Sequence, residues 1–314
     1  MKKILLVGGR GFVGCILAEM LKTNGKQVYI TKTVNENILA NYPCYNMDLL
    51  NISEIEHVIN EIRPDEIYHL AAQSSVALSW KNPTMTIDVN VKGVVNLLET
   101  IRSIDIKPRI LIVGSGEEYG YIKPEECPIN ENNLPRPGNI YAATKVAQNM
   151  ISTIYANAYD MDIVLTRSFN HIGPGQSPTF VVSDFCKQVA EIEAGIREPI
   201  IYVGNLSVKR DFSDVRDVCR AYMMLMEKGI SGETYNVGSG CSISINEILN
   251  KILSYSSKKI KIEVDSNKLR PVDILNIEAD IGKIVNDIGW NTEISIDDTI
   301  KCTLNYWRQE SNLF

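Results

Sequence analysis

The sequence KILLVGGRGFVG, residues 3–14, decides the fold. The run from Ile4 to Val7 is short and apolar, which is typical of a buried parallel strand. Gly8, Gly11 and Gly14 follow at intervals of three, and apolar residues then recur at helical spacing as far as Lys22. A strand, a glycine-rich turn and a helix in this order indicate a dinucleotide-binding βαβ unit.

Glycines in such a turn let the backbone approach a pyrophosphate, which binds at the N-terminus of the following helix. The next expected strand, residues 27–31, lacks the terminal carboxylate that NAD-selective sites use to bind the ribose 2′-OH. The cations Arg10 and Lys32 instead favour a 2′-phosphate, although Lys32 could equally be a solvated loop residue. We therefore expect NADPH, with NADH as the alternative. The expected phosphate contacts are Gly8, Arg10, Gly11, Phe12, Val13 and Gly14, with Thr31 and Lys32 at the 2′-position.

Expected strands and helices alternate up to residue 168, which predicts an α/β fold with a Rossmann-like, doubly wound parallel sheet. We expect residues 1–168 to form a dinucleotide-binding domain, with residues 212–237 returning to it. Residues 169–211 and 238–314 then form a smaller, mixed α/β C-terminal region that binds the substrate. Two local predictions accompany this division. Ser53 caps a helix over residues 53–62 in a capping box with Glu56, and residues 210–215 rejoin the central sheet.

Composition excludes several classes of function. The chain has 314 residues and a formal net charge of -6, without a dense run of Lys and Arg, so we expect no nucleic-acid partner. Seven scattered Cys and three His favour neither a disulfide framework nor a zinc site, so we expect no bound metal. We find no apolar run long enough to cross a bilayer and no signal-peptide layout, so we expect a cytoplasmic protein without a membrane partner.

A second pattern carries chemistry. Tyr141 and Lys145 are four residues apart, so on a helix they share one face. A neighbouring ammonium favours the phenolate, which lets a Tyr exchange a proton nearer to neutral pH. Ser115 follows an expected strand over residues 109–114, at the sheet edge where ligands bind in open parallel sheets. Tyr and Lys at this spacing are also common on solvated helix faces.

Together, the glycine turn, Ser115 and the Tyr141-x-x-x-Lys145 pattern resemble the extended short-chain dehydrogenase/reductase family over nearly the whole chain. The resemblance implies that Ser115 orients the substrate oxygen and Tyr141 passes the proton. Lys145 would lower the Tyr pKa and bind the nicotinamide ribose, and Asn90 would complete the relay, although a structural role for Asn90 is equally open. The resemblance also implies a homodimer formed through the helices that carry Asn90 and Tyr141. We expect the remaining cofactor contacts from Asp48, Leu49, Leu70, Ala71, Ala72 and His171.

Further segments narrow the resemblance to enzymes of nucleotide sugars, in the group of GDP-mannose 4,6-dehydratase and GDP-4-keto-6-deoxymannose reductase. They are residues 69–76, 117–120, 170–176, 210–212 and 270–271. The resemblance implies that Asn170, Arg210 and Arg270 hold the nucleotide diphosphate, because guanidinium groups bind phosphate as a fork. The competing interpretations are a salt bridge from Arg210 to Asp211 or Asp214, and a surface position for Arg270. Further expected substrate contacts are Ser75, Ser115, Glu117 and Lys187.

Gly116 favours reduction over dehydration. Elimination of water needs both a base and an acid, and dehydratase relatives follow the catalytic Ser or Thr with Asp-Glu or Ser-Glu. Here Gly116 offers no proton, and Glu117 could be catalytic or bind a sugar hydroxyl. We expect reduction of the C4 ketone of a nucleotide 4-keto-6-deoxyhexose, with GDP-4-keto-6-deoxy-D-mannose giving GDP-D-rhamnose as the favoured pair. The alternatives are a GDP-mannose 4,6-dehydratase, another dehydratase or epimerase that recycles NAD(P), and a non-catalytic dinucleotide-binding subunit.

Overall fold

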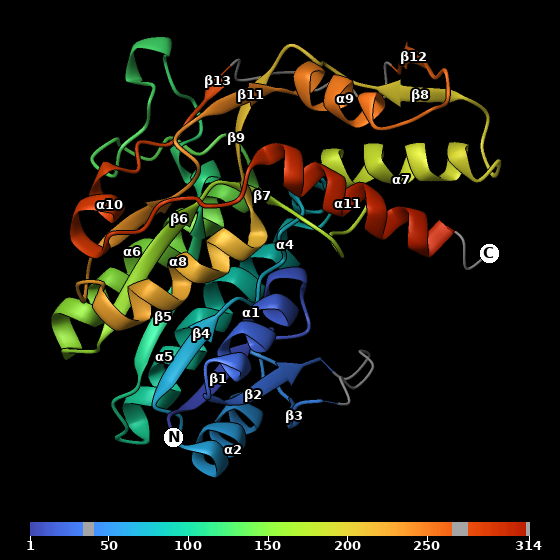
Figure 1. Ribbon diagram of the computed structural model, residues 1–314. Coiled ribbons are helices and arrows are strands. Elements are labelled where there is room, and N and C mark those ends of the chain that lie inside the picture. The colour runs from blue at the N-terminus through green and yellow to red at the C-terminus, as the bar shows by residue number, and fades with distance from the viewer. Residues whose placement is uncertain (34–40, 266–275, 312–314) are drawn as a thin grey trace.

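A seven-stranded parallel sheet lies at the centre of the protein, whose computed structural model describes residues 1–33, 41–265 and 276–311 (Figure 1). Its strand order is β10-β6-β5-β4-β1-β2-β3, and every neighbouring pair is parallel. The predicted doubly wound Rossmann-like fold is therefore confirmed. The strands are β1 (Lys3–Val7), β2 (Gln27–Lys32), β3 (Cys44–Asn46), β4 (Glu66–His69), β5 (Arg109–Ser115), β6 (Ile163–Ser168) and β10 (Thr234–Val237).

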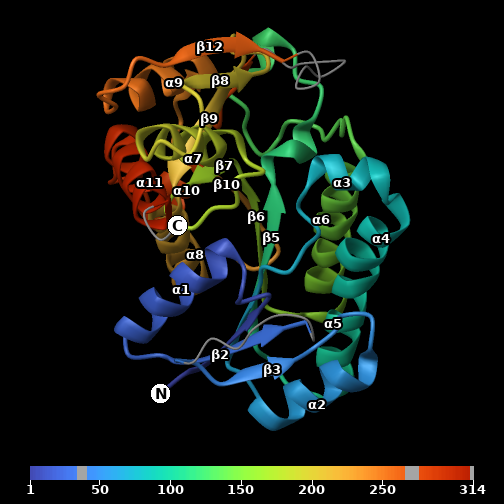
Figure 2. The same cartoon turned by 90° about the vertical axis from the view of Figure 1, so that its right-hand side faces the viewer.

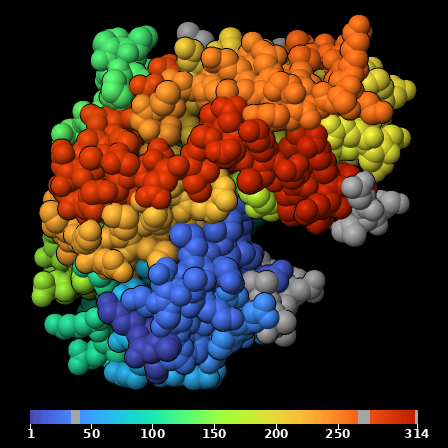
Figure 3. Space-filling model, viewed as in Figure 1, coloured from blue at the N-terminus to red at the C-terminus, as the bar shows by residue number. Residues whose placement is uncertain are grey.

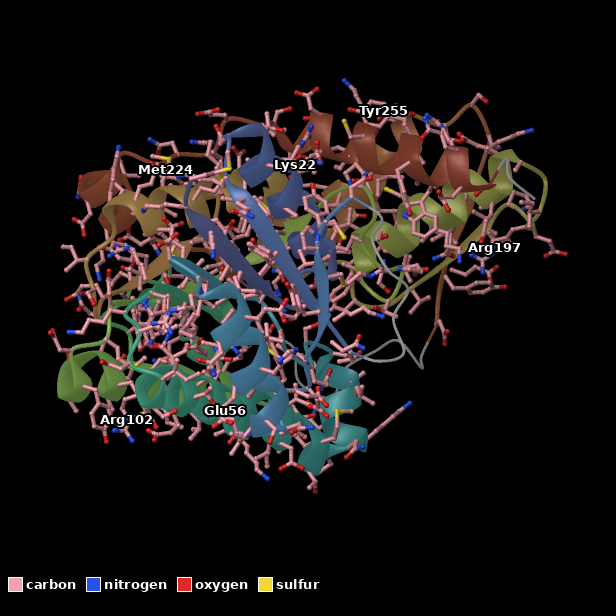
Figure 4. All side chains as sticks on the ribbon, turned by 90° about the horizontal axis from the view of Figure 1, so that it is seen from below. Lys22, Glu56, Arg102, Arg197, Met224 and Tyr255 are labelled. Atoms are coloured by element: carbon pink, nitrogen blue, oxygen red, sulfur yellow. The ribbon has the colours of Figure 1, made fainter. Side chains whose placement is uncertain are left out.

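Helices cover both faces of this sheet because alternate side chains of each strand point to opposite sides. Ile4 and Leu6 of β1 pack in one core with helices α1 (Phe12–Thr23) and α8 (Val215–Lys228), together with α10 (Gly282–Ile288). Leu5 and Val7 pack in a second core with α2 (Ile52–Ile62) and α5 (Gly93–Ser103). Figure 4 shows the two layers, with Lys22 and Met224 on one side of the strands and Glu56 and Arg102 on the other.

The helical segment that carries Asn90 is interrupted. It consists of α4 (Pro83–Ile87), a π-helical turn η1 (Asp88–Lys92) and α5, with Asn90 fully buried in the π turn. Such turns are rare and are frequent at functional sites. The long helix α6 (Ile140–Tyr159) packs beside this segment and also contacts β5, β6 and α3 (Val76–Lys81).

The C-terminal region has its own small sheets and core. Strand β9 (Lys209–Asp214) pairs with β7 (Asn170–Ile172), β11 (Ser242–Ser244) and β13 (Asn276–Ile277). The prediction that residues 210–215 rejoin the central sheet is therefore wrong, although β10 and α8 do lie on that sheet. Strand β8 (Ile200–Val203) pairs with β12 (Lys261–Val264). Helices α7 (Val181–Glu193), α9 (Ile245–Ser254) and α11 (Ile296–Ser311) pack around a third core.

The elements of this C-terminal region lie together beside the central sheet (Figures 1 and 2). The space-filling view shows the surface hollowed between the N-terminal part of the chain, in blue, and α11, in red (Figure 3). Within the described residues, no helix is long and apolar enough to cross a membrane. The division of the chain into a cofactor domain and a substrate region at the boundaries given above stays a proposal.

One predicted helix cap is wrong. Helix α2 begins at Ile52 with Asn51 as its N-cap, so Ser53 lies inside the first turn. Glu54, rather than Glu56, reaches back, and its carboxylate accepts hydrogen bonds from the Asn51 amide and from Asp48 N. Ser53 and Glu56 have the spacing of a capping box, which predicts a cap two residues after the observed N-cap, Asn51.

Candidate active site

The glycine-rich turn makes close backbone contacts both with the first helix and with the segment that follows the fourth strand. Gly8 has φ +80, and a Cβ atom added there would lie 2.8 Å from the backbone of Ala71. A Cβ atom added at Gly14 would lie 2.6 Å from the Gly9 carbonyl oxygen, so only glycine lets α1 pack this closely. Leu70 N donates to Val7 O, which holds the segment after β4 beside the turn. The expected cofactor contacts at Gly8, Gly14, Leu70 and Ala71 thus lie together.

The N-terminus of α1 is suited to bind an anion. Gly11 is its N-cap without a side-chain hydrogen bond, and no acidic residue lies in the first turn, Phe12 to Gly14. Its free N–H groups and the helix dipole favour a phosphate. Arg10 lies beside this turn, and its Nε is buried without a hydrogen-bond partner in the described part of the chain. These features fit the pyrophosphate of a dinucleotide.

The expected 2′-phosphate contacts divide into one buried and one accessible residue. Thr31 is buried at 2% exposure, and its Oγ1 accepts a hydrogen bond from Gly8 N at 3.1 Å. Thr31 therefore supports the glycine turn from inside the protein, and its expected place at the 2′-position stays a prediction. Lys32, at the end of β2, is partly exposed.

The adenosine side of the expected site is also ordered by local hydrogen bonds. Asp48 is exposed and its Oδ1 accepts a hydrogen bond from Leu50 N. The buried Leu49 lies beneath Gly93, and its carbonyl oxygen accepts from the Asn96 amide at 2.8 Å. The turn after β3 is thereby held against the α5 side of the sheet.

Ser115 stands at the end of β5, where a 3-10 turn, residues 116–119, begins. Its Oγ accepts a hydrogen bond from Glu117 N at 3.2 Å. The Glu117 carboxylate in turn accepts from the Asn139 side-chain amide at 3.1 Å. Asn139 is the N-cap of α6 and also accepts from Ala142 N. The turn that carries Ser115 and the helix that carries Tyr141 are therefore joined through Glu117 and Asn139.

Tyr141 and Ser115 lie within interacting distance in a buried setting. Tyr141 is 9% exposed and Ser115 is 8% exposed. Burial raises the pKa of Tyr141, while its hydrogen bond with Ser115 lowers that pKa and the carboxylates of Glu117 and Glu118 raise it. The phenol is therefore held protonated in the ligand-free protein.

Lys145 shares the buried face of α6 with Tyr141, as the spacing predicted. Its Nζ donates to Val113 O at 2.8 Å and to Gln148 Oε1 at 3.0 Å. Burial lowers the pKa of Lys145 to about 8, against the opposing charge of Glu118. In this state the ammonium is thus anchored to strand β5 and to its own helix. The expected lowering of the Tyr141 pKa by Lys145 is not what this ligand-free arrangement produces.

Asn90 has a structural place in the site. Its Oδ1 accepts a hydrogen bond from Gln73 N at 2.8 Å, and its Nδ2 donates to Gln73 O and to Thr144 Oγ1. Thr144 Oγ1 donates to Tyr141 O. Asn90 therefore ties the segment after Ala71 and Ala72 to the helix that carries Tyr141, and its amide is occupied by protein groups.

The residue after Ser115 is enclosed by an aromatic ring. A Cβ atom added at Gly116 would lie 3.1 to 3.3 Å from ring atoms of Phe169. Phe169 is buried, follows β6, and donates from its N–H to Val237 O. A side chain at position 116 would therefore need the Phe169 ring to move by a few tenths of an ångström.

The expected cofactor contact His171 lies beside two of the expected substrate residues, Asn170 and Arg210. His171 stacks on Phe12, with ring centroids 6.2 Å apart, and burial lowers its pKa. Asn170 is exposed beside it on β7, and Arg210 lies on β9, the neighbouring strand. The Asp211 carboxylate accepts hydrogen bonds from Ser239 N, Gly240 N and Ala279 N. The Asp214 carboxylate forms an ion pair with Arg216.

The remaining expected contacts are more dispersed. Ser75 caps α3 by accepting a hydrogen bond from Leu78 N. Lys187 pairs with Glu191 at 3.7 Å and lies over the Trp307 ring, on the seam between α7 and α11. Arg270 lies outside the described residues. The site roles of these three residues stay predictions.

Comparison with known proteins agrees with this geometry. A family model described as GDP-mannose 4,6 dehydratase matches residues 5–303, nearly the whole chain. The chain belongs to this family. The GDP-6-deoxy-D-mannose reductase of Pseudomonas aeruginosa is 29% identical over 98% of this chain and 97% of its own length. The GDP-mannose 4,6-dehydratase of Yersinia enterocolitica is 28% identical over 95% of this chain and 91% of its own length.

Solved structures of related enzymes share the fold. A structure of RMD from Pseudomonas aeruginosa complexed with NADPH has a TM-score of 0.89 at 28% identity, covering 99% of this chain and all of that chain. A UDP-glucose 4-epimerase of Thermus thermophilus in complex with NAD has a TM-score of 0.86 at 27% identity, covering 98% of this chain and 99% of that chain. The chain is thus similar to proteins named as a reductase, as a dehydratase and as an epimerase.

Sequence reasoning missed several residues that build this site. Asn139 was not singled out, although an Asn directly before a helical run is a recognisable N-cap signal. No local sequence pattern marks Phe169 or Gln148 as site residues. Both reach the site through contacts between segments that are far apart in the chain. Thr144, within the Tyr141–Lys145 turn of α6, was also missed.

Proposed function

We propose that this protein reduces the C4 ketone of a nucleotide 4-keto-6-deoxyhexose with NADPH, NADH being the alternative. The favoured substrate is GDP-4-keto-6-deoxy-D-mannose, which gives GDP-D-rhamnose. One observation carries the proposal: Ser115, Tyr141 and Lys145 lie together at the end of β5, while Phe169 fills the space beside Gly116. The names of the similar Pseudomonas protein and of the structure with NADPH support the same choice.

The mechanism assigns each buried group one task. When bound, NADPH supplies a hydride to the carbonyl carbon, and the N-terminus of α1, Arg10 and Lys32 would hold its phosphates. Ser115 Oγ donates a hydrogen bond to the carbonyl oxygen and orients it. Tyr141, held protonated by its burial, gives its proton to that oxygen as the alkoxide forms. Lys145 stabilises the phenolate that remains.

The surroundings of Glu117 favour a binding role. The Glu117 carboxylate accepts a hydrogen bond from the Asn139 side-chain amide. The residue before Glu117 is Gly116, which has no side chain. Elimination of water would need a second proton-transfer group at that turn. Glu117 therefore binds a sugar hydroxyl and fixes the α6 N-terminus in this proposal, and the dehydratase alternative lacks half of its acid–base pair.

The test is one incubation with GDP-4-keto-6-deoxy-D-mannose and NADPH. We expect NADPH absorbance to fall with one cofactor consumed per sugar reduced, and NMR of the product to show a C4 alcohol. An enzyme that recycles NAD(P), such as a dehydratase or an epimerase, would give product with no net loss of NADPH. Cofactor binding without turnover on a panel of keto-sugars would instead indicate a non-catalytic subunit.

A variant pair on α6 isolates the role of Tyr141. Tyr141→Phe removes the proton donor and should lower kcat by about 100-fold or more, while the KM for substrate changes little. Tyr155→Phe is the matched control, because Tyr155 lies on the same helix and donates its hydroxyl to Glu99 outside the site. A Tyr141→Phe variant that keeps near-normal turnover would refute the assignment.

We also propose that two copies pair through α3, α4 and α6. These helices expose large apolar side chains, which monomeric proteins seldom gather on one surface. Ile154 is 58% exposed and Met150 is 63% exposed on successive turns of α6, and Trp80 is 62% exposed on α3. Ile87 on α4 is also exposed.

A cytoplasmic location and a GDP-specific substrate are further parts of the proposed function.

Sedimentation measures the pairing. The wild-type chain should sediment as a dimer, and the double variant Met150→Glu/Ile154→Lys should sediment as a folded monomer. Val264→Lys, which changes an exposed apolar residue of β12, is the control and should leave the dimer intact. A wild-type monomer at micromolar concentration would contradict the proposed interface.

A further inference from the structure

A buried glutamate lies next to the proton-relay residues and has no role in the mechanism above. Glu118 is the third residue of the turn after β5, and its side chain is fully buried. A carboxylate is almost never fully buried unless it is paired. The partners of Glu118 therefore indicate what the side chain does. Glu118 Oε1 accepts a hydrogen bond from Ser115 N at 2.8 Å, and Oε2 accepts from Arg167 Nε at 3.0 Å.

Glycine at position 114 leaves room for the Glu118 carboxylate. A Cβ atom added at Gly114 would lie 2.4 Å from Glu118 Oε1 and 2.2 Å from Thr166 O. Any other residue at position 114 would therefore displace the Glu118 side chain from the end of β5. Ser115 has extended backbone angles, φ -144 and ψ 142, and the turn closes in a capping box in which Glu118 reaches back to Ser115. The glutamate thus holds the backbone of the residue that orients the substrate oxygen.

Arg167 holds the other oxygen of the carboxylate. Its guanidinium lies over the Tyr119 ring at 4.7 Å, and its Nη1 donates to Glu131 O. These contacts hold the guanidinium of Arg167, on β6, in one position. The ion pair therefore fixes the position of the Glu118 carboxylate and opposes the rise in its pKa that burial causes.

The charge of Glu118 also acts on α6. Its carboxylate raises the pKa of Lys145 against the lowering caused by burial, and it contributes to the raised pKa of Tyr141. Glu117, in the same turn, acts on Tyr141 in the same direction, and Lys145 lowers the pKa of the buried His69 on β4. Burial raises the pKa of Glu118 itself to about 7, so the carboxylate is charged at alkaline pH.

We propose that Glu118 is a positioning residue: its buried carboxylate, held by Arg167, fixes the Ser115 backbone and sets a negative charge in the turn that contacts the helix carrying Tyr141 and Lys145. The proposal deepens the function proposed above and rests on it for the catalytic consequence. The effect on Lys145 is a property of the protein alone, so it can be measured without cofactor or substrate.

The decisive measurement is an NMR titration of isotope-labelled lysine in the ligand-free protein, with Lys145→Met identifying the signal. In the wild-type protein, Lys145 should titrate near pH 8. In Glu118→Gln, which keeps the shape but removes the charge, the midpoint should fall on the order of one pH unit. An unchanged midpoint in a folded Glu118→Gln protein would overturn the proposal.

Turnover supplies the second readout. Glu118 raises the pKa of both Tyr141 and Lys145, so its removal should move the alkaline limb of kcat to lower pH, whichever group carries that limb. A purely structural role would lower kcat equally at every pH and leave the limb in place. If the wild-type protein showed no reductase activity, the function proposed above would fail while the lysine titration would still test Glu118.

Two further variants guard this test. Glu118→Gln leaves a buried guanidinium without its counter-ion and could prevent folding. Glu118→Gln/Arg167→Gln removes both charges and should fold, and its Lys145 midpoint should still lie below that of the wild-type protein. Asp217→Asn is the matched control, because Asp217 is a buried carboxylate that accepts from Glu293 N, Ile294 N and Arg220. It should leave the Lys145 midpoint unchanged.

Discussion

The ring of Phe169 stands 3.1 Å from the point where a side chain at Gly116 would begin. Phe169 belongs to the segment after β6, and Gly116 to the turn after β5, so the contact joins the ends of neighbouring strands. The missing proton donor at position 116 is thus a matter of space as well as of residue type. A donor side chain at position 116 would press on the Phe169 ring, which would have to move by a few tenths of an ångström.

Gly116→Ser should therefore harm the protein without creating dehydratase activity. The added atoms meet a buried ring, and such overpacking typically costs about 1–3 kcal/mol. We expect a lower urea midpoint and reduced reductase turnover. Gly116→Ser/Phe169→Leu should recover stability, because the smaller side chain makes room. Full stability in the single variant would contradict the close contact.

Asn90→Ala should destabilise the fold. The substitution leaves Gln73 N and Gln73 O without their partner in a partly buried place beside the fully buried Asn90 site, and an unsatisfied buried group costs about 1–3 kcal/mol. We expect a loss of at least about 2 kcal/mol in urea unfolding. Asn24→Ala, which removes an exposed hydrogen bond to Met20 O, should change stability by less than about 0.5 kcal/mol. A variant with normal stability and low kcat would instead favour a relay role for Asn90.

Lys32→Ala should reduce the preference for NADPH. Loss of one charged contact to a 2′-phosphate costs about 1.5–3 kcal/mol, so the KM for NADPH should rise by about 10-fold or more while the KM for NADH stays similar. Lys26→Ala is the control, since Lys26 lies before the opposite end of β2. A wild-type enzyme that strongly prefers NADH would overturn the cofactor choice.

His69 should make the fold sensitive to acid. Both ring nitrogens are buried without partners in the described part of the chain, and burial lowers the His69 pKa to about 3. The unfolded chain, with a His pKa near ~6.5, then binds more protons than the folded chain at pH values between these two. Stability is therefore full above about pH 6.5 and is lost as the pH falls toward 3.

Urea unfolding at several pH values measures this effect. His69→Asn should flatten the loss of stability between about pH 6.5 and pH 5. His57→Gln is the matched control, because the His57 side chain is 71% exposed on α2 and should leave the slope unchanged. Equal slopes for all three proteins would show that the buried ring is not the source of acid sensitivity.

Features carried by local patterns could be predicted from the sequence. The strand, the glycine turn and the helix are adjacent in the chain, and Tyr141 and Lys145 share a helix face by spacing alone. Features that depend on register could not. Thr31 faces inward because one step along a strand reverses the side of the sheet. Strand β9, with the sequence KRDFSD, pairs only with segments distant in sequence, so nothing local revealed its sheet.

The position of strand β10 in the chain has a consequence for folding during translation. The sheet edge beside β6 is covered only by β10, and one face of the sheet is covered partly by α8, both of which lie after residue 214. A nascent chain that ends at residue 168 would leave the ribosome with an open strand edge and an uncovered apolar face, which are hazards for aggregation. The central sheet therefore cannot be completed during translation until Val237 has emerged, by which point residues 169–211 have already left the ribosome.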